Sequence, residues 1–285
     1  MSDIRIGLLH PGEMGAAVGR CLTGRGIQVR WASAGRGAAT AARADAAGLT
    51  DAGTIAELAS GAGALLSICP PHAAVAVARE VASAGFGGLY VDANAVAPAT
   101  AQEIGGIVTA AGAAFTDGGI IGLPPGPDDS GGTRLYLAGG RAGEVAELFA
   151  GTALDARIVS GDAGPAPAGA ASALKMSYAA WTKGTSALLL AIRALAQAEG
   201  VEDALLAEWS LSQPDLPARS VRAARSAAAK GWRWIGEMEE ISASMTARDL
   251  PGGFHQAAAE IYRRYSGDLP EGGDSPEAGE SSAAG

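Results

Sequence analysis

A glycine-containing turn near the N-terminus has the residue types and spacing of a phosphate-binding loop. It reads His10-Pro11-Gly12-Glu13-Met14-Gly15 and lies between an apolar stretch and a helical segment. Gly12 would let the backbone approach a pyrophosphate, Gly15 would let the helix pack close to the strand, and the free amides of the helix N-terminus would face the anion. Because His10 stands where GxGxxG has its first glycine, the loop fits a dinucleotide site and an ordinary strand-to-helix turn equally well.

The end of the next expected strand indicates which dinucleotide this turn would bind. A site that prefers NAD usually carries Asp or Glu about 20 residues after the turn, where it bonds the ribose hydroxyls. Here the chain has Ser33 and Arg36 instead. A guanidinium can hold a 2′-phosphate through two hydrogen bonds. The pattern favours NADP over NAD, and the alternative is that Arg36 is a solvated loop charge.

Two of the three lysines, Lys175 and Lys183, lie on one long apolar helical segment. A polar stripe shares one helix face with Lys175 and consists of Ser172, Tyr178, Thr182 and Ser186. Lys183 lies about 80° around the helix from Lys175 and need not share that face. A polar stripe on a helix that links two domains suits the wall of a cleft. Lys175 is therefore the catalytic candidate, and a surface lysine is the alternative.

The elements that must position these residues follow from the hydrophobic pattern. Six short apolar stretches are typical of strands: residues 4–9, 29–32, 64–69, 88–92, 114–117 and 135–138. Because Ala-rich helical segments separate them, they predict parallel βαβ units and a doubly wound sheet over residues 1–162. Residues 160–169 are rich in Gly, Pro and Ala and mark a domain boundary.

The second half of the chain is predicted to be all-helical over residues 168–265. A long helix is expected from about 168 to 199, followed by helices at 202–211, 217–229, 232–246 and 253–265. Residues 266–285 are acidic, with almost no apolar anchor, and are predicted to form a disordered tail.

Composition narrows the classes of function. The 285 residues carry a net charge of -9, which opposes nonspecific nucleic-acid binding because that rests on Lys and Arg. Two cysteines and three scattered histidines give no ligand spacing, so no metal site is expected. No basic leader precedes an apolar segment, and no apolar run is long enough to cross a membrane. We expect a cytoplasmic protein.

Three segments resemble, in order and spacing, the signatures of the β-hydroxyacid dehydrogenase and 6-phosphogluconate dehydrogenase superfamily. They are the turn ending in Met14-Gly15, the segment Ser67-Ile68-Cys69-Pro70-Pro71 and the segment Asp92-Ala93-Asn94-Ala95-Val96-Ala97-Pro98. The resemblance extends from about residue 3 to 265, and the C-terminal half is similar to the branch with a DUF1932-type helical domain. It implies an α/β fold in which an N-terminal Rossmann sheet is followed by a long interdomain helix and an all-α C-terminal domain.

The resemblance also implies which residues border the cofactor. In this family the two prolines and the asparagine would border the ribose and nicotinamide. With the turn and the second strand end, the predicted NADP-binding residues are His10, Pro11, Gly12, Glu13, Met14, Ser33, Arg36, Cys69, Pro70, Pro71 and Asn94. The alternative for the later residues is strand-terminating turn chemistry, which Pro and Asn also support.

The segment from Gly169 to Met176 looks like the family's glycine-then-lysine motif, in which the lysine is the general acid/base. Lys175 would take the hydroxyl proton as hydride leaves the substrate carbon, and would return it in reduction. This requires a pKa that an apolar cleft has lowered. The family commonly has Asn four residues later, where this chain has Ala179, so Tyr178 could replace the lost contact or transfer the proton itself.

The substrate-binding loop of the family, a Ser with two glycines, corresponds here to Gly119, Ile120 and Ile121 in the segment after Asp117. Loss of the hydroxyl and gain of Ile121 argue against a small β-hydroxyacid and for a larger, less polar ketone, alcohol or imine. Further predicted substrate residues from the last helices are Trp234, Glu237 and His255. Their alternatives are an interface aromatic, a solvated acidic face and a first-turn helix residue.

Three functions are compatible with these residues. The first is an NADP-dependent oxidoreductase acting on a carbonyl or hydroxyl carbon, with Lys175 as acid/base. The second is an imine reductase with Tyr178 as proton donor, against which Lys175 argues. The third is a non-catalytic nucleotide-binding dimer or sensor, suggested by His10 and Ala179. In each case a homodimer through the C-terminal helical domain is expected, with no membrane or nucleic-acid partner.

Overall fold

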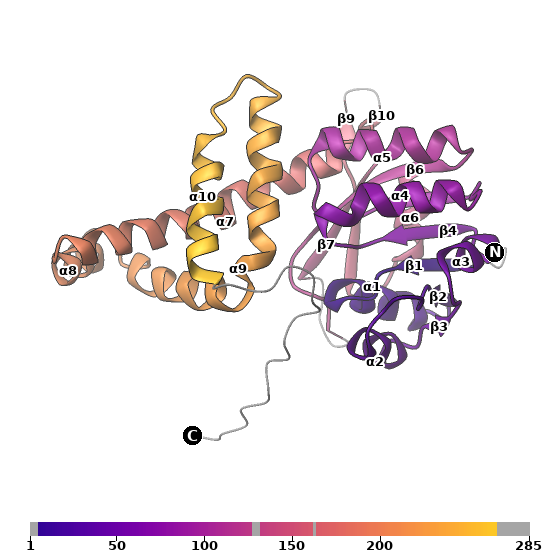
Figure 1. The fold of residues 1–285 in the computed structure, drawn as a ribbon, viewed down its shortest axis with the longest axis horizontal. Coiled ribbons are helices and arrows are strands. Elements are labelled where there is room, and N and C mark those ends of the chain that lie inside the picture. Colours follow the sequence, from indigo (N-terminus) through magenta and orange to yellow (C-terminus); the bar gives the residue numbers. More distant parts are fainter. Residues whose placement is uncertain (1–4, 127–131, 162–163, 267–285) are drawn as a thin grey trace.

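The computed structural model describes residues 5–126, 132–161 and 164–266. Within them, one sheet holds eight strands in the order β3-β2-β1-β4-β5-β6-β7-β8 (Figure 1). Neighbouring strands are parallel except for β6 and β7, which are antiparallel. The strands are β1 Ile6–Leu9, β2 Val29–Trp31, β3 Thr50–Asp51, β4 Ala64–Ser67, β5 Leu89–Asp92, β6 Ala114–Ile121, β7 Thr133–Ala138 and β8 Leu154–Ile158. A separate antiparallel pair is formed by β9 Ser160–Gly161 and β10 Gly164–Pro165.

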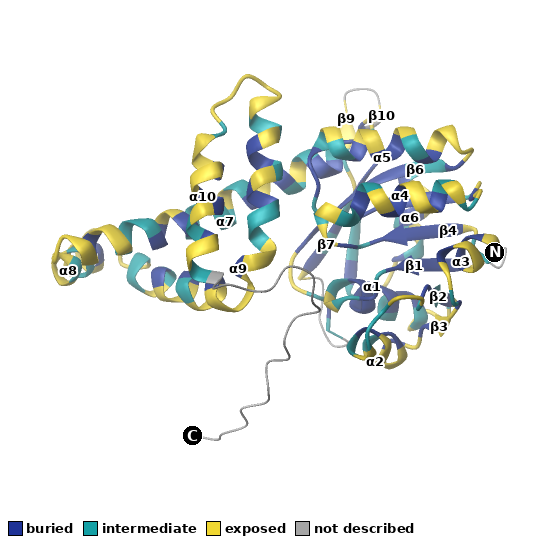
Figure 2. Cartoon of the chain, in the orientation of Figure 1, coloured by how far each residue is buried: buried dark blue, intermediate teal, exposed yellow. Residues whose placement is uncertain are grey.

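Helices cover both faces of the sheet, as a doubly wound fold requires. One face packs against α1 Glu13–Thr23, α2 Ala38–Ala46 and α6 Ala142–Leu148. The other packs against α3 Ile55–Gly61, α4 Ala74–Ser83 and α5 Pro98–Ala110. The residues of β1, β4 and β5 are all buried, which explains why their sequences are continuous apolar runs (Figure 2).

The predicted Rossmann sheet is confirmed, with differences at its far edge. β6 continues to Ile121, so the segment expected as a substrate loop is a strand. The connection over residues 122–132 is too short to hold a crossover helix, and β7 therefore returns antiparallel to β6. The sequence pattern missed β3, which has two exposed residues, and β8, an edge strand whose apolar residues alternate with Asp155 and Arg157.

The helical half contains α7 Ala170–Ala198, α8 Glu202–Ser212, α9 Leu216–Thr246 and α10 Gly253–Ser266 (Figure 1). Its core is formed where α9 and α10 pack against α7, around Met176, Leu190, Met238 and Tyr262. The two helices predicted at 217–229 and 232–246 are a single helix. Gly231 is buried inside it, and a lone glycine weakens a helix by only about 1 kcal/mol, which tertiary packing can offset.

Two other expectations concern the ends of the chain and membranes. Ser266, the first residue of the predicted tail, is the last residue of α10. The rest of that tail, residues 267–285, lies outside the described residues, as does Ile4 of the first predicted strand. Among the described residues, no helix has the length and apolar character needed to cross a membrane.

The long helix α7 is seated directly on β6. The carboxylate of Asp117 accepts hydrogen bonds at Oδ2 from the backbone amides of Gly169, Ala171 and Ser172 at 2.8, 2.8 and 3.1 Å. Its Oδ1 accepts a fourth from the Ser172 hydroxyl at 2.6 Å. These bonds satisfy amides that a helix N-terminus otherwise leaves without partners. The first turn of α7 is thereby fixed to the middle of the sheet.

Gly119 allows the helix to approach this closely. A Cβ at this position would lie 2.7 Å from the carbonyl oxygen of Ala171 and 3.0 Å from the Cβ of Lys175. A side chain larger than hydrogen would therefore push α7 away from β6.

Gly119→Ala is expected to lower the free energy of unfolding by about 1–3 kcal/mol, because overpacking forces backbone shifts. Denaturant unfolding followed by circular dichroism measures the change. Gly106→Ala in α5 is the matched control, since its Cβ would meet no atom within 4 Å, and it should be neutral or slightly stabilising. Equal stability of the two variants would show that α7 is not packed tightly against Gly119.

Candidate functional site

The carboxyl ends of β1, β4 and β5 bring together the segments that the sequence singled out. Ligands of doubly wound folds bind at this edge. Gly12 is the N-cap of α1, and as glycine it has no side chain that could cap the helix. A Cβ at Gly12 would meet no atom within 4 Å, whereas one at Gly15 would lie 2.2 Å from the carbonyl oxygen of His10. Gly12 thus leaves open space in front of free amides, and Gly15 allows α1 to pack against the end of β1.

His10 and Arg36 lie at the same edge. The backbone of His10 is left-handed, with φ of 76°, so the turn keeps a conformation that glycine adopts more easily. Burial, reinforced by the charge of Arg36, lowers the pKa of His10 to about 4, and the imidazole is neutral at physiological pH. The Arg36 charge also acts on Cys69. The guanidinium therefore lies near His10, which follows β1, and near Cys69, which follows β4.

Polar atoms at this edge support a ligand site. The Nε atom of Arg36 is buried and has no hydrogen-bond partner among the described residues. Ser33 hydrogen-bonds Asp51 and lowers the pKa of that carboxyl. A buried donor without a partner is costly, so a bound group with acceptor oxygens would satisfy it.

Asn94 and Cys69 form a hydrogen-bond network between the ends of β4 and β5. The Oδ1 of Asn94 accepts from the backbone amide of Cys69 at 2.6 Å. Its Nδ2 donates to the Ser67 hydroxyl at 3.0 Å and to Asp92. Both amide hydrogens of Asn94 are already used within the protein. The side chain therefore holds the turn at Pro70 in place and has no free donor to offer a ligand.

The remaining predicted cofactor residues lie around the turn. Pro71 begins a short 3₁₀ helix, Pro71–Ala73, directly after exposed Pro70. Pro11 is buried, and Met14 packs partly buried against the core under α1. Glu13 forms an ion pair with Arg233 of α9 at 2.8 Å. This pair joins the start of α1 to the helical half. Hydrogen bonds to Glu240 of α9 join the helical half to the start of α5 as well.

Lys175 lies over the part of β6 that extends past the end of β5. Asp92, the last residue of β5, is in register with Asp117, and Gly119 beneath Lys175 is two residues further on. Burial lowers the pKa of Lys175 from 10.5 to about 8; the Glu237 carboxylate opposes this shift and the Lys183 ammonium adds to it. The side chain itself is half-buried. Lys175 thus stands at the same edge as the turn at Gly12.

A charged and aromatic cluster from three helices lies further along α7, around Lys183. Lys183 of α7 forms an ion pair with buried Glu237 of α9, and its ammonium lies 5.7 Å from the centre of the Trp234 ring. Trp234 packs edge-on against Tyr262 of α10, with ring centres 5.1 Å apart. The Tyr262 hydroxyl donates to the carbonyl of Lys183 at 2.6 Å. His255 is buried, with Nε2 3.4 Å from the carbonyl oxygen of Ala180.

The structure separates the other predicted residues from this cluster. Tyr178 lies on an exposed face of α7. Ile120 and Ile121 are buried in β6, and Ile120 belongs to the core of the sheet, so neither offers an open loop.

Sequence reasoning missed Lys183, Tyr262, Arg233 and the role of Asp117. Helical spacing alone places Lys183 about 80° from Lys175. Only its pairing with Glu237, 54 residues away, brings both lysines near one carboxylate.

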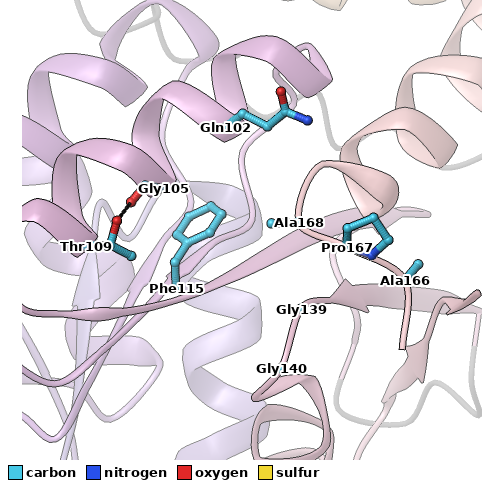
Figure 3. Close-up of a pocket in the computed structure, with 9 residues that line it drawn as sticks. All are labelled: Gln102, Gly105, Thr109, Phe115, Gly139, Gly140, Ala166, Pro167 and Ala168. Atoms are coloured by element: carbon cyan, nitrogen blue, oxygen red, sulfur yellow. Dashed lines mark hydrogen bonds between the residues drawn. The ribbon is translucent and has the colours of Figure 1, made fainter. Parts of the chain in front are cut away.

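Two cavities border the described residues away from Lys175. The larger lies between α5, β6 and the segment before α7 (Figure 3), and its lining residues are Gln102, Gly105, Thr109, Phe115, Gly139, Gly140, Ala166, Pro167 and Ala168. None of the predicted site residues lines it. The second lies against α1 and includes Glu13, Arg20, Arg43 and Lys230.

Comparison with known proteins adds the following. Residues 196–265 match the family described as a domain of unknown function, DUF1932, which confirms the expected type of C-terminal domain. No curated protein sequence matches the chain.

Solved structures match over nearly the whole chain. A conserved protein of unknown function, described as structurally similar to 3-hydroxyacid dehydrogenases, has a TM-score of 0.67 and 25% identity, over 92% of this chain and 96% of its own. The 3-hydroxyisobutyrate dehydrogenase of Mycobacterium tuberculosis, solved with L-serine, has a TM-score of 0.68 and 18% identity, over 93% and 94%. A reductive aminase from Aspergillus terreus, solved with NADPH and ethyl levulinate, has a TM-score of 0.58 and 18% identity, over 92% and 93%. The chain therefore has the fold shared by 3-hydroxyacid dehydrogenases and reductive aminases.

The charges around Lys175 should set its reactivity in opposite directions. Glu237→Gln removes the charge that raises the pKa of Lys175, so at pH 7 more of the amine is neutral and acylation by a small amine reagent is faster. Lys183→Met removes the charge that lowers this pKa, so acylation is slower. A change of half to one pKa unit alters the neutral fraction roughly three- to tenfold. Peptide mass spectrometry of the modified Lys175 measures the rates.

Glu239→Gln is the control, because Glu239 is an exposed residue of the same helix that pairs with Arg263. It should leave the acylation rate of Lys175 unchanged. Shifts of Lys175 reactivity in the same direction for Glu237→Gln and Lys183→Met would contradict this electrostatic account.

Proposed function

We propose that this protein is an NADP-dependent oxidoreductase that transfers hydride between nicotinamide and a carbonyl or hydroxyl carbon, with Lys175 as general acid/base. The observation that carries the proposal is the position of Lys175, half-buried over β6 with a pKa of about 8, at the sheet edge that holds the open turn at Gly12. A proton-transfer group works best when its pKa is near the operating pH. The fold shared with dehydrogenases and reductive aminases supports the same class of reaction.

The residues at the sheet edge fit a phosphorylated dinucleotide. Gly12 and the free amides of α1 would hold the pyrophosphate. Arg36, with its unpartnered Nε, would hold the 2′-phosphate, which supports NADP over NAD. Ser33 would join it by turning its hydroxyl from Asp51 to the phosphate. The solved structures of similar fold that contain NADPH support a nicotinamide cofactor. When bound, such a cofactor accepts hydride from the substrate carbon or donates hydride to it.

Lys175 would move the proton that accompanies this hydride. As a neutral amine its Nζ accepts the substrate hydroxyl proton, and as an ammonium it returns that proton to the carbonyl oxygen in reduction. Burial keeps both forms populated near neutral to mildly alkaline pH. Lys183 is already paired with Glu237, so it does not offer a free charge to a substrate carboxylate. This pairing, with Trp234 beside it, favours an uncharged ketone or alcohol.

A second candidate is an imine reductase in which Tyr178 is the proton donor. Its support is that Tyr178 is exposed one turn beyond Lys175, on a fold that reductive aminases share.

Turnover of pooled substrates tests these assignments. The purified protein is offered NADPH or NADH with ketones, keto acids and cyclic imines, and cofactor absorbance is followed. We expect turnover with NADPH, slower turnover with NADH, and a loss of at least about 100-fold in Lys175→Met, because general acid catalysis contributes that much. Tyr178→Phe is the matched variant on the same helix and should retain activity. Arg36→Ala should raise the KM for NADPH more than that for NADH.

Other outcomes have distinct meanings. Full activity of Lys175→Met together with an inactive Tyr178→Phe would favour the imine reductase. Equal use of NADH would make the Arg36 assignment wrong. Tight NADPH binding without turnover of any pool would support a nucleotide-binding dimer that lacks chemistry.

We also propose that the protein is a homodimer joined through its helical domain. An exposed apolar stripe runs along α7 through Leu174, Tyr178, Trp181, Leu188 and Leu195, at spacings of four, three, seven and seven residues. This spacing is typical of helices that pack against another helix. Trp181 is 66% exposed in the single chain. Figure 2 shows that the outer part of α7 and α8 is much less buried than the sheet.

A charge within the stripe should separate the subunits. Trp181→Glu is expected to halve the mass in sedimentation at micromolar concentration, because burying an unpaired carboxylate in an apolar interface is costly. Ile158→Glu, an exposed apolar residue of β8 outside the stripe, is the control and should leave the dimer intact. A wild-type protein that sediments as a monomer would contradict the proposal.

A further inference from the structure

Two buried carboxyl groups lie side by side beneath the site. Asp92 and Asp117 are both fully buried and face each other in register on the neighbouring strands β5 and β6. Asp117 accepts four hydrogen bonds from the first turn of α7. Burial raises the pKa of Asp117, and these four hydrogen bonds, three of them from backbone amides of a helix N-terminus, oppose the rise and favour the ionised carboxylate.

Asp92 has the opposite environment. Its Oδ1 accepts from Asn94, and its Oδ2 is buried with no hydrogen-bond partner among the described residues. An ionised carboxylate with an unpartnered oxygen in the interior is costly, and a second ionised carboxylate beside it adds repulsion. The geometry therefore suits one proton on the pair, held by Asp92 while Asp117 remains ionised.

The other titratable groups against Asp92 do not offset its charge. Burial raises the pKa of Tyr90 on β5 and of Cys69 after β4, and the Asp92 charge raises both further. The pKa of Cys69 reaches about 12. Both are neutral at physiological pH. Burial and the charge of Asp117 raise the pKa of Asp92 to about 8, and its bonds with Asn94 only partly oppose this shift.

The pair connects the two parts of the site. On one side, Asp117 fixes the turn of α7 that precedes Lys175. On the other side, Asp92 bonds Asn94, and Asn94 holds the amide of Cys69 at the start of the proline turn. Both halves of the site therefore depend on carboxyl groups that neither ligand nor solvent reaches directly.

We propose that Asp92 and Asp117 act as a positioning pair that shares one proton, in which ionised Asp117 seats the Lys175 helix and protonated Asp92 holds the cofactor-side turn. The inference rests on the proposed function only in the role that it gives Lys175. Loss of the Asp92 proton places two negative charges side by side in the core and loosens both attachments.

The first test follows unfolding against pH and needs no substrate or cofactor. An acid whose pKa is higher in the folded than in the unfolded state stabilises the fold fully below its unfolded pKa, and this stabilisation is lost as pH rises to the folded pKa. Relative to Asp92→Asn, which cannot titrate, the wild-type folding equilibrium constant should fall about tenfold per pH unit between pH 5 and pH 8 and level off above. Groups common to both proteins cancel in this comparison.

Thr116→Val is the control, because Thr116 is as deeply buried on β6 and its hydroxyl has no partner among the described residues. Its stability relative to wild type should not change with pH. A difference between wild type and Asp92→Asn that is also independent of pH would overturn the shared proton, whatever the enzyme activity is.

The second test asks whether Asp117 positions Lys175. Asp117→Asn should change the acylation rate of Lys175 at pH 7 by several-fold. If that variant does not fold, Ser172→Ala removes one of the four bonds and should change the rate in the same sense by less. The affinity for NADPH should change little in Ser172→Ala. Unchanged Lys175 reactivity in a folded Asp117 variant would overturn the positioning role, whereas absence of turnover in the wild type would refute the proposed function alone.

Discussion

The site depends on the attachment of one helix to one strand by a single buried carboxylate. Asp117 satisfies three amides and one hydroxyl at the start of α7, and Gly119 lets the helix lie against the strand two residues further on. Hydrogen bonds to a charged group are worth more than those between neutral groups. Because α7 is 29 residues long, a small change at this attachment displaces everything that the helix carries.

Three faces of α7 have different surroundings. Residues near its start face β6 and include Lys175. A second face packs against α9 and α10 and brings Lys183 to Glu237. A third face, with Trp181, is exposed among the described residues. The same element therefore supports the fold, the proposed chemistry and the proposed contact between subunits.

Much of this arrangement could be predicted from the sequence, because it is local. The strand, turn and helix around Gly12 follow from residue order, as do the beginning and end of α7. The pairs that define the environment of Lys175 could not be predicted in this way. Lys183 and Glu237 are 54 residues apart, and Asp117 and Ser172 are 55 apart. No periodicity encodes such contacts, since they arise only when α7 packs against α9 and against β6.

Two polar contacts attach α9 to the α/β half, and these contacts differ in strength. Glu13 and Arg233 form a half-exposed ion pair, which salt screens and which contributes little. Glu240 accepts from the backbone amide of buried Ala97 at 2.5 Å and from Thr100 at 3.1 Å, so it caps the start of α5. The contact at Arg233, near the middle of α9, is therefore the easier one to release. The Glu240 contact should persist at salt concentrations that weaken the Glu13–Arg233 pair, so α9 would keep its attachment to the start of α5.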